Sequence, residues 1–105
     1  MYDHNQTLVP DSFLALYTRN SRPTLERREL EARYEACEDL ALHVAELCRN
    51  RQQGVDDAPE ALHHCYDGLI APPLSTPRPE AVWVVRRVAE LLEWPVPGWV
   101  DSAGE

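Results

Sequence analysis

Residues 24–53 form a stretch of thirty residues without glycine or proline, although the 105-residue chain holds nine prolines and four glycines elsewhere. Within this stretch, apolar residues recur at alternating steps of four and three: Leu30, Tyr34, Cys37, Ala41, Val44 and Cys48. The spacing predicts one apolar stripe along an α-helix over about residues 24–52. Such a helix would be about 40 Å long, so we expect it to be the central element of the fold.

Three shorter helices are indicated by their start and stop signals. The first spans about residues 10–17. The second begins at a capping box of Asp57 and Glu60 and ends near Gly68. The last spans residues 76–94, with two prolines in its first turn, where their missing N–H groups cost nothing. The predicted fold class is all-α: a small bundle of about four helices with one long central helix.

The chain divides into one domain and two end segments. Residues 1–8 are polar and predicted to be flexible, residues 9–94 form a single helical domain, and residues 95–105 form an extended tail rich in proline and tryptophan. Trp99 is expected to fold back onto the core, because an aromatic side chain beside prolines is costly to leave in water. The alternative is that the tail serves as a docking peptide.

Charge and composition disfavour several classes of function. The net charge is −8 and all ten basic residues are arginine, so we expect no nucleic-acid binding. The absence of lysine also removes Schiff-base and P-loop lysine chemistry. No apolar run is long enough to span a bilayer. Three cysteines without CxxC spacing indicate reduced thiols, and we expect a cytoplasmic protein without membrane contact.

Three segments carry a resemblance to a known family. They are Val9-Pro10-Asp11-Ser12-Phe13 with Leu16-Tyr17, then Arg33-Tyr34-Glu35-x-Cys37-Glu38-Asp39-Leu40, then Trp83-Val84-Val85-x-Arg87-Val88-Ala89-Glu90-Leu91-Leu92-x-Trp94. Over most of its length the chain resembles a family of small uncharacterised β-proteobacterial helical proteins, some labelled "ATPase with chaperone activity". The resemblance implies no catalytic residues. It departs at Glu93, where the family usually has glycine, and in the tail that continues after Trp94.

The residues do not support the ATPase label. A P-loop enzyme needs GxxxxGK[ST] to bind the phosphates and Mg²⁺, and this chain has four scattered glycines and no lysine. We therefore expect no intrinsic P-loop ATPase activity, although a role beside a chaperone or ATPase partner fits the resemblance.

The sharpest candidate for chemistry is a metal site. Glu60 and His63 have the i, i+3 spacing that di-metal four-helix bundles use, and Cys65 follows on the same helix, with His43, His64, Cys37 and Cys48 as further donors. However, Glu60 is already explained as the capping-box acid, and the motif occurs once where a di-metal bundle needs two. A nucleophilic pair of Cys65 and His43 has no glycine-rich elbow or oxyanion nest beside it.

The long helix carries an acidic face opposite its apolar stripe. It consists of five carboxylates: Glu31, Glu35, Glu38, Asp39 and Glu46. Solvated charge is the ordinary explanation for such a face. The functional alternative is a patch for a basic partner, or for Arg86 and Arg87 of the last helix. Together with Trp99, the residues Glu31, Glu35, Glu38 and Asp39 are the predicted interaction residues.

These observations favour a non-enzymatic helical protein that binds a protein partner or itself, in an accessory or chaperone-associated role. No cofactor and no catalytic residue are predicted. The alternative is a metal- or thiol-linked helical protein that uses His63, Cys65 and neighbouring Cys and His residues.

Overall fold

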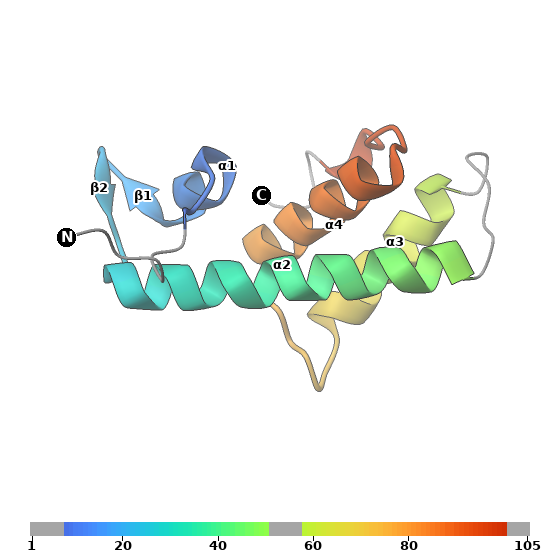
Figure 1. Cartoon of the computed structure of the whole chain (residues 1–105), viewed down its shortest axis with the longest axis horizontal. Helices are drawn as coiled ribbons and strands as arrows, with labels where there is room; N and C mark the ends of the chain where they lie inside the picture. The colour runs from blue at the N-terminus through green and yellow to red at the C-terminus, as the bar shows by residue number, and fades with distance from the viewer. Residues whose placement is uncertain (1–7, 51–57, 101–105) are drawn as a thin grey trace.

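The computed structural model describes residues 8–50 and 58–100, which fold into a mostly helical chain (Figure 1). The elements in chain order are α1 (Asp11–Leu14), the 3-10 helix η1 (Ala15–Tyr17), β1 (Thr18–Arg19), β2 (Arg22–Pro23), α2 (Arg27–Asn50), α3 (Ala58–Ile70) and α4 (Arg78–Leu92). The mostly-α class is confirmed. Most of the predicted N-terminal segment, and the end of the predicted tail, lie outside the described residues.

The apolar stripe of the long helix is confirmed, but the helix begins later than predicted. Leu30, Cys37, Ala41 and Cys48 are buried in α2. Thr24 does not cap this helix, because its N–H and Oγ1 both donate to the Tyr17 carbonyl, at 2.7 and 3.1 Å. Three residues therefore remain outside the helix, which starts at Arg27.

A small β-hairpin lies between η1 and α2. Thr18 pairs with Pro23 and Arg19 with Arg22 in antiparallel register. Between them, Asn20 and Ser21 have φ angles of 52° and 66°. Two successive left-handed residues are typical of the tight hairpin turns that match the twist of the strands.

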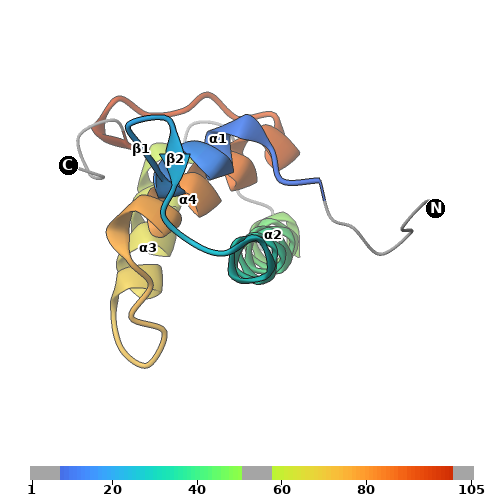
Figure 2. The ribbon, with the colours of Figure 1, turned by 90° about the vertical axis from the view of Figure 1, so that its left-hand side faces the viewer.

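Helix α4, rather than the long helix, has the most packing partners. It contacts α2, α3 and α1, whereas α2 and α3 make little direct contact with each other. Figure 2 looks nearly along α2 and shows α4 next to both α2 and α3. Most buried residues of α4 are small or β-branched and form one broad face, which lets neighbouring helices pack closely: Ala81, Val84, Val85, Val88 and Ala89. The predicted bundle around one long central helix is therefore not confirmed.

Two helix ends also differ from expectation. Helix α3 does not stop at Gly68, whose φ is not positive, and it continues to Ile70. Helix α4 ends at Leu92, and Glu93 follows with a φ of 57°. The Trp94 N–H then donates to the Ala89 carbonyl at 2.9 Å. This hydrogen bond is typical of an α-helix that ends with one residue in the left-handed conformation.

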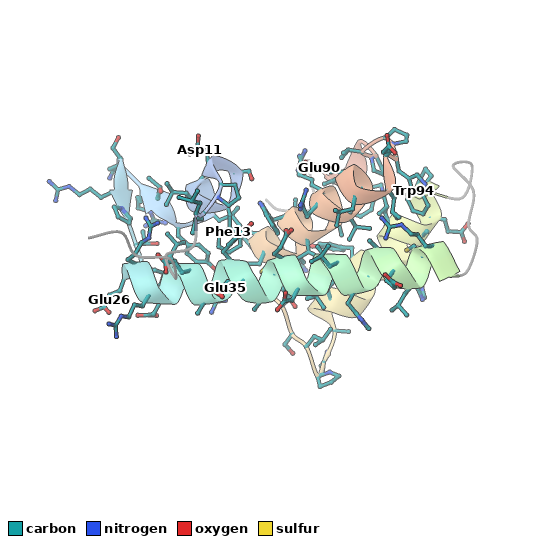
Figure 3. All side chains as sticks on the ribbon, in the orientation of Figure 1. Asp11, Phe13, Glu26, Glu35, Glu90 and Trp94 are labelled. Atoms are coloured by element: carbon teal, nitrogen blue, oxygen red, sulfur yellow. The ribbon has the colours of Figure 1, made fainter. Side chains whose placement is uncertain are left out.

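The core is built around an aromatic cluster and reaches into the tail. Phe13 is fully buried, with ring centroids 5.2–5.8 Å from those of Trp83, Tyr34 and Tyr17. Figure 3 shows Phe13 on the side of α1 that faces α2. Val100 is also fully buried, so the described part of the tail returns to the domain. None of the helices in the described ranges is long and apolar enough to cross a bilayer.

Candidate functional site

A buried polar cluster joins the N-terminal segment to the two main helices. Glu80, in the first turn of α4, is only 4% exposed. Its Oε2 accepts hydrogen bonds from the Tyr17 hydroxyl and from Arg33 Nε, the latter at 2.5 Å. Its Oε1 accepts a weaker one from the Cys37 thiol at 3.6 Å. One carboxylate therefore connects η1, α2 and α4.

The electrostatics of this cluster fit a structural role better than a catalytic one. Burial raises the pKa of the Glu80 carboxyl above its usual range, because it disfavours the charged form. Burial also raises the pKa of Cys37 to about 11, against the opposing charge of Arg33. A thiol with such a pKa stays protonated at neutral pH and is a poor nucleophile.

A different region of the molecule is open to a partner. An apolar groove of about 670 Å³ lies between the C-terminal half of α2 and the length of α3. Helix α2 contributes Leu40, His43, Val44, Leu47 and Cys48; helix α3 contributes Glu60, Ala61, His64, Cys65, Gly68 and Leu69; Leu74 closes one end. We call this the α2/α3 groove.

The groove exists because α3 is held by α4 and not by α2. The side of α3 that faces the groove carries small residues: Ala61, Cys65 and Gly68. A Cβ atom placed on Gly68 would meet nothing within 4 Å, so this side of the helix has room beside it. Large side chains of the described residues therefore do not fill the space between the two helices.

Large apolar side chains at the groove remain in contact with water. Leu47 is 44% exposed and Leu74 is 54% exposed. Leu74 is held there by the loop between α3 and α4, in which the Thr76 N–H donates to the Leu69 carbonyl at 2.9 Å. Exposed leucines gathered around one groove are typical of a binding surface, whereas single exposed leucines are ordinary.

The predicted metal ligands are not brought together. Glu60 and Cys65 line the groove, whereas His63 lies outside it, with Nδ1 3.2 Å from Asp67 and its ring 4.8 Å from the Trp99 ring. Across residues 8–50 and 58–100, no three His, Cys, Asp or Glu side chains form a group that could hold a metal ion. Cys37, Cys48 and Cys65 form no disulfide bonds.

The predicted acidic face of α2 is divided between two roles. Glu31 pairs with Arg27 at 2.5 Å. Glu38 accepts two hydrogen bonds of 2.9 Å from Arg87 on α4, the geometry of a bidentate ion pair. Two of the predicted interaction residues are therefore engaged within the chain.

The remaining acids are exposed. Glu35, Asp39 and Glu46 all lie on the solvent side of α2. Asp39 and Glu46 are at i−4 and i+3 from His43, so they neighbour the groove along the helix surface. Among the described residues, neither of these two forms an ion pair.

Trp99, the other predicted interaction residue, packs on α3. Its ring lies 5.6 Å from that of Tyr66 and close to His63. It is half-buried, so only part of its surface is available to a partner.

Two kinds of functional feature escaped the sequence reasoning. Glu80 looked like an ordinary first-turn acid, and no local signal distinguishes it from a solvated one. Leu47 lies on α2 to one side of the buried stripe and is exposed. The apolar residues on this side of α2 could have indicated an exposed surface. One neighbouring helix cannot cover a wide apolar arc, so some of its side chains stay outside the core.

Comparison of the chain with protein families, curated proteins and solved structures finds no match. The geometry of the described residues is therefore the basis for any functional conclusion.

Proposed function

We propose that this chain is a non-enzymatic helical protein whose α2/α3 groove binds a helical segment of another protein. The observation that carries the proposal is an apolar groove of about 670 Å³ with exposed leucines at its edge. Covering such side chains is favourable by about 25 cal/mol for each Å² of apolar surface removed from water. A helix laid into a groove is a common way to cover them.

The setting of this function follows from the chain's chemistry. Three cysteines without a disulfide bond suit a reducing compartment, and the proposal places the protein in the cytoplasm. The resemblance to proteins labelled as chaperone-associated supports an accessory role beside such a partner. The net charge of −8 opposes binding to nucleic acid.

The chain offers a matched pair of positions for testing the groove. Leu42 and Leu47 are both exposed leucines on α2, at 47% and 44%. Leu47 lines the groove and Leu42 does not, since five residues turn the helix by about 140°. A photo-crosslinking amino acid can therefore replace either leucine with a similar effect on folding.

We expect position 47 to form a covalent adduct with one protein, identified by mass spectrometry, when the protein is made in its native cells. Position 42 should not form that adduct, and Leu47→Asp should abolish binding of the identified protein while Leu42→Asp leaves it intact. Equal crosslinking from both positions, or none from position 47, would contradict the proposal.

The alternative, a metal- or thiol-linked protein, predicts a different result. Zinc or iron bound in stoichiometric amount to the purified protein, with a marked rise in Tm, would favour it. Loss of that rise in Tm in a Cys65→Ala variant would show that the Cys65 thiol is one of the metal ligands.

A further inference from the structure

We propose that the occupant of the α2/α3 groove is a single amphipathic helix of a partner protein, with apolar anchors flanked by lysine or arginine. This inference rests on the proposed function and names the chemistry of the partner. It follows from the length of the groove, the open face of α3 and the charge around it.

The dimensions of the groove suit one helix. On α2 its lining residues run from Leu40 to Cys48, and on α3 from Glu60 to Leu69. At 1.5 Å for each residue these segments are about 12 and 14 Å long, so a helix of three to four turns would cover them. The anchors of such a helix recur at i, i+3, i+4 and i+7.

The α3 wall allows a close approach at one point. Gly68 is exposed within a helix that continues to Ile70, although glycine weakens a helix interior. Nothing lies within 4 Å of the position its Cβ would take. A large apolar side chain of the partner, inserted from the groove, would fill this space, whereas a large side chain at position 68 itself would block it.

The charge around the groove favours basic residues beside the apolar anchors of the partner helix. Among the described residues that line it, none is lysine or arginine, and Glu60 is the only carboxylate. Asp39 and Glu46 neighbour it on α2, and Asp67 is exposed on α3, where it lies 3.2 Å from His63 Nδ1 outside the groove. These acids surround an apolar interior, so basic residues on either side of the apolar anchors would meet carboxylates.

The same charge disfavours a second copy of this chain as occupant. Two copies would each bring a net charge of −8, and like charges at an interface oppose association. A basic partner helix would instead be attracted, and its binding would weaken as salt screens the charges.

The test uses two synthetic peptides of about four helical turns with identical leucine anchors. One carries lysine at the flanking positions and the other carries glutamate at the same positions. Binding of each fluorescently labelled peptide is measured by anisotropy with the full chain, at about 0.05 M and about 0.5 M salt.

Two variants at one position separate docking from folding. Gly68→Trp places a large side chain in the groove, and Gly68→Ala adds only a methyl group. Position 68 is exposed and a Cβ there meets nothing within 4 Å, so we expect both variants to fold, which far-UV circular dichroism checks. Gly68→Ala should raise Tm by about 2–8 °C.

We expect the lysine peptide to bind the wild-type chain at least about tenfold more tightly than the glutamate peptide at low salt. The difference should shrink at high salt, and Gly68→Trp should lose at least about tenfold affinity while Gly68→Ala stays within threefold of wild type.

Four results would overturn the inference. Equal binding of the two peptides would show that basic flanking residues are not recognised. Peptide binding unaffected by Gly68→Trp would place the helix elsewhere. A homodimer in light scattering that Gly68→Trp converts to a monomer would make a second copy the occupant. If neither peptide binds, the inference about the partner helix is wrong. The crosslinking comparison of positions 42 and 47 then still tests the proposed function separately.

Discussion

Glu80 is a buried charged residue that connects three separate elements of the fold. It lies in the first turn of α4, where an acid suits the positive end of the helix. Its carboxylate accepts hydrogen bonds from Tyr17, Arg33 and Cys37, and the Arg33 guanidinium lies 5.7 Å from the Tyr17 ring centroid. No buried side-chain nitrogen or oxygen in the described ranges lacks a hydrogen-bond partner, so the cost of burying this charge is offset locally.

The raised pKa of Glu80 predicts how acid affects stability. Because burial holds the pKa in the folded state above the unfolded-state value, the ionised carboxylate opposes folding at neutral pH. That opposition is relieved as the pH falls through the folded-state pKa towards about 4.3, the usual value for glutamate. The wild-type chain should therefore gain free energy of unfolding relative to Glu80→Gln on acidification.

Urea unfolding of both chains between about pH 7 and pH 4 measures this difference, since other groups titrate equally in the two proteins. A wild-type chain that loses stability relative to Glu80→Gln as the pH falls would show that the ion pair with Arg33 outweighs burial.

The three thiols should differ in reactivity. Cys65 is half-buried and lines the groove, whereas Cys37 and Cys48 are 4% and 6% exposed. Burial also raises the pKa of Cys37 to about 11, so very little reactive thiolate forms there near pH 8. We expect iodoacetamide to modify Cys65 first, at least about tenfold faster than Cys37.

Peptide mapping by mass spectrometry would locate each modification, and the same reaction in denaturant gives the control in which the three rates converge. Fast modification of Cys37 in the folded protein would show that the polar cluster opens readily.

At the scale of single elements, the end of α4 carries a local strain that can be removed. Glu93 has a φ of 57°, a left-handed conformation that costs a residue with a Cβ about 1–2 kcal/mol. Glycine adopts it freely, although it also gains entropy in the unfolded chain. Glu93→Gly should therefore raise the free energy of unfolding by about 0.5–1 kcal/mol.

Chemical denaturation would measure this gain, with Glu90→Gly as the matched control. Glu90 is exposed inside α4, where glycine should cost about 0.5–1 kcal/mol. A loss of stability in Glu93→Gly would mean that the side chain of Glu93 contributes more than its backbone conformation costs.

Helix positions could be predicted from the sequence because the cause is local. The stripe from Leu30 to Cys48 and the prolines before α4 depend on spacing within one segment, and both led to the correct element. The start of α2 could not be found this way. Thr24 has the chemistry of a helix cap, but the Tyr17 carbonyl takes its hydrogen bonds instead, and that carbonyl belongs to a different element.

At the scale of the whole molecule, the aromatic cluster joins the N-terminal segment to the rest. Phe13 contacts Tyr17, Tyr34 and Trp83, and Trp83 Nε1 donates to Ser12 Oγ at 3.0 Å. Phe13→Ala should cost about 3–5 kcal/mol, a large share of the 5–15 kcal/mol typical of a domain.

Thermal unfolding followed by near-UV circular dichroism would detect both the lost stability and the loosened Trp83. Leu14→Ala is the neighbouring control, because Leu14 is only half-buried and should cost clearly less. Equal losses in the two variants would show that Phe13 is not the main anchor.

The groove itself could not be predicted from the sequence. Ala61 and Cys65 have the spacing of a core-facing side of a helix, and Gly68 reads as a helix stop, so neither pattern indicates an open groove. The spacing of apolar residues does not show which helix α3 will pack against. In the structure α3 packs on α4, and its contact with α2 is slight. Such a choice depends on how three helices fit together, which no single segment specifies.

The attachment of α3 mainly through α4 has a consequence for how the protein opens. Most of the interface that holds α2 lies on α4, so α3 can separate from the pair without breaking that interface. Proteins open locally in cooperative units whose free energies differ. Amide hydrogen exchange should therefore be faster throughout α3 than in the centres of α2 and α4, and a ligand in the groove should slow it selectively by making α3 part of the same cooperative unit.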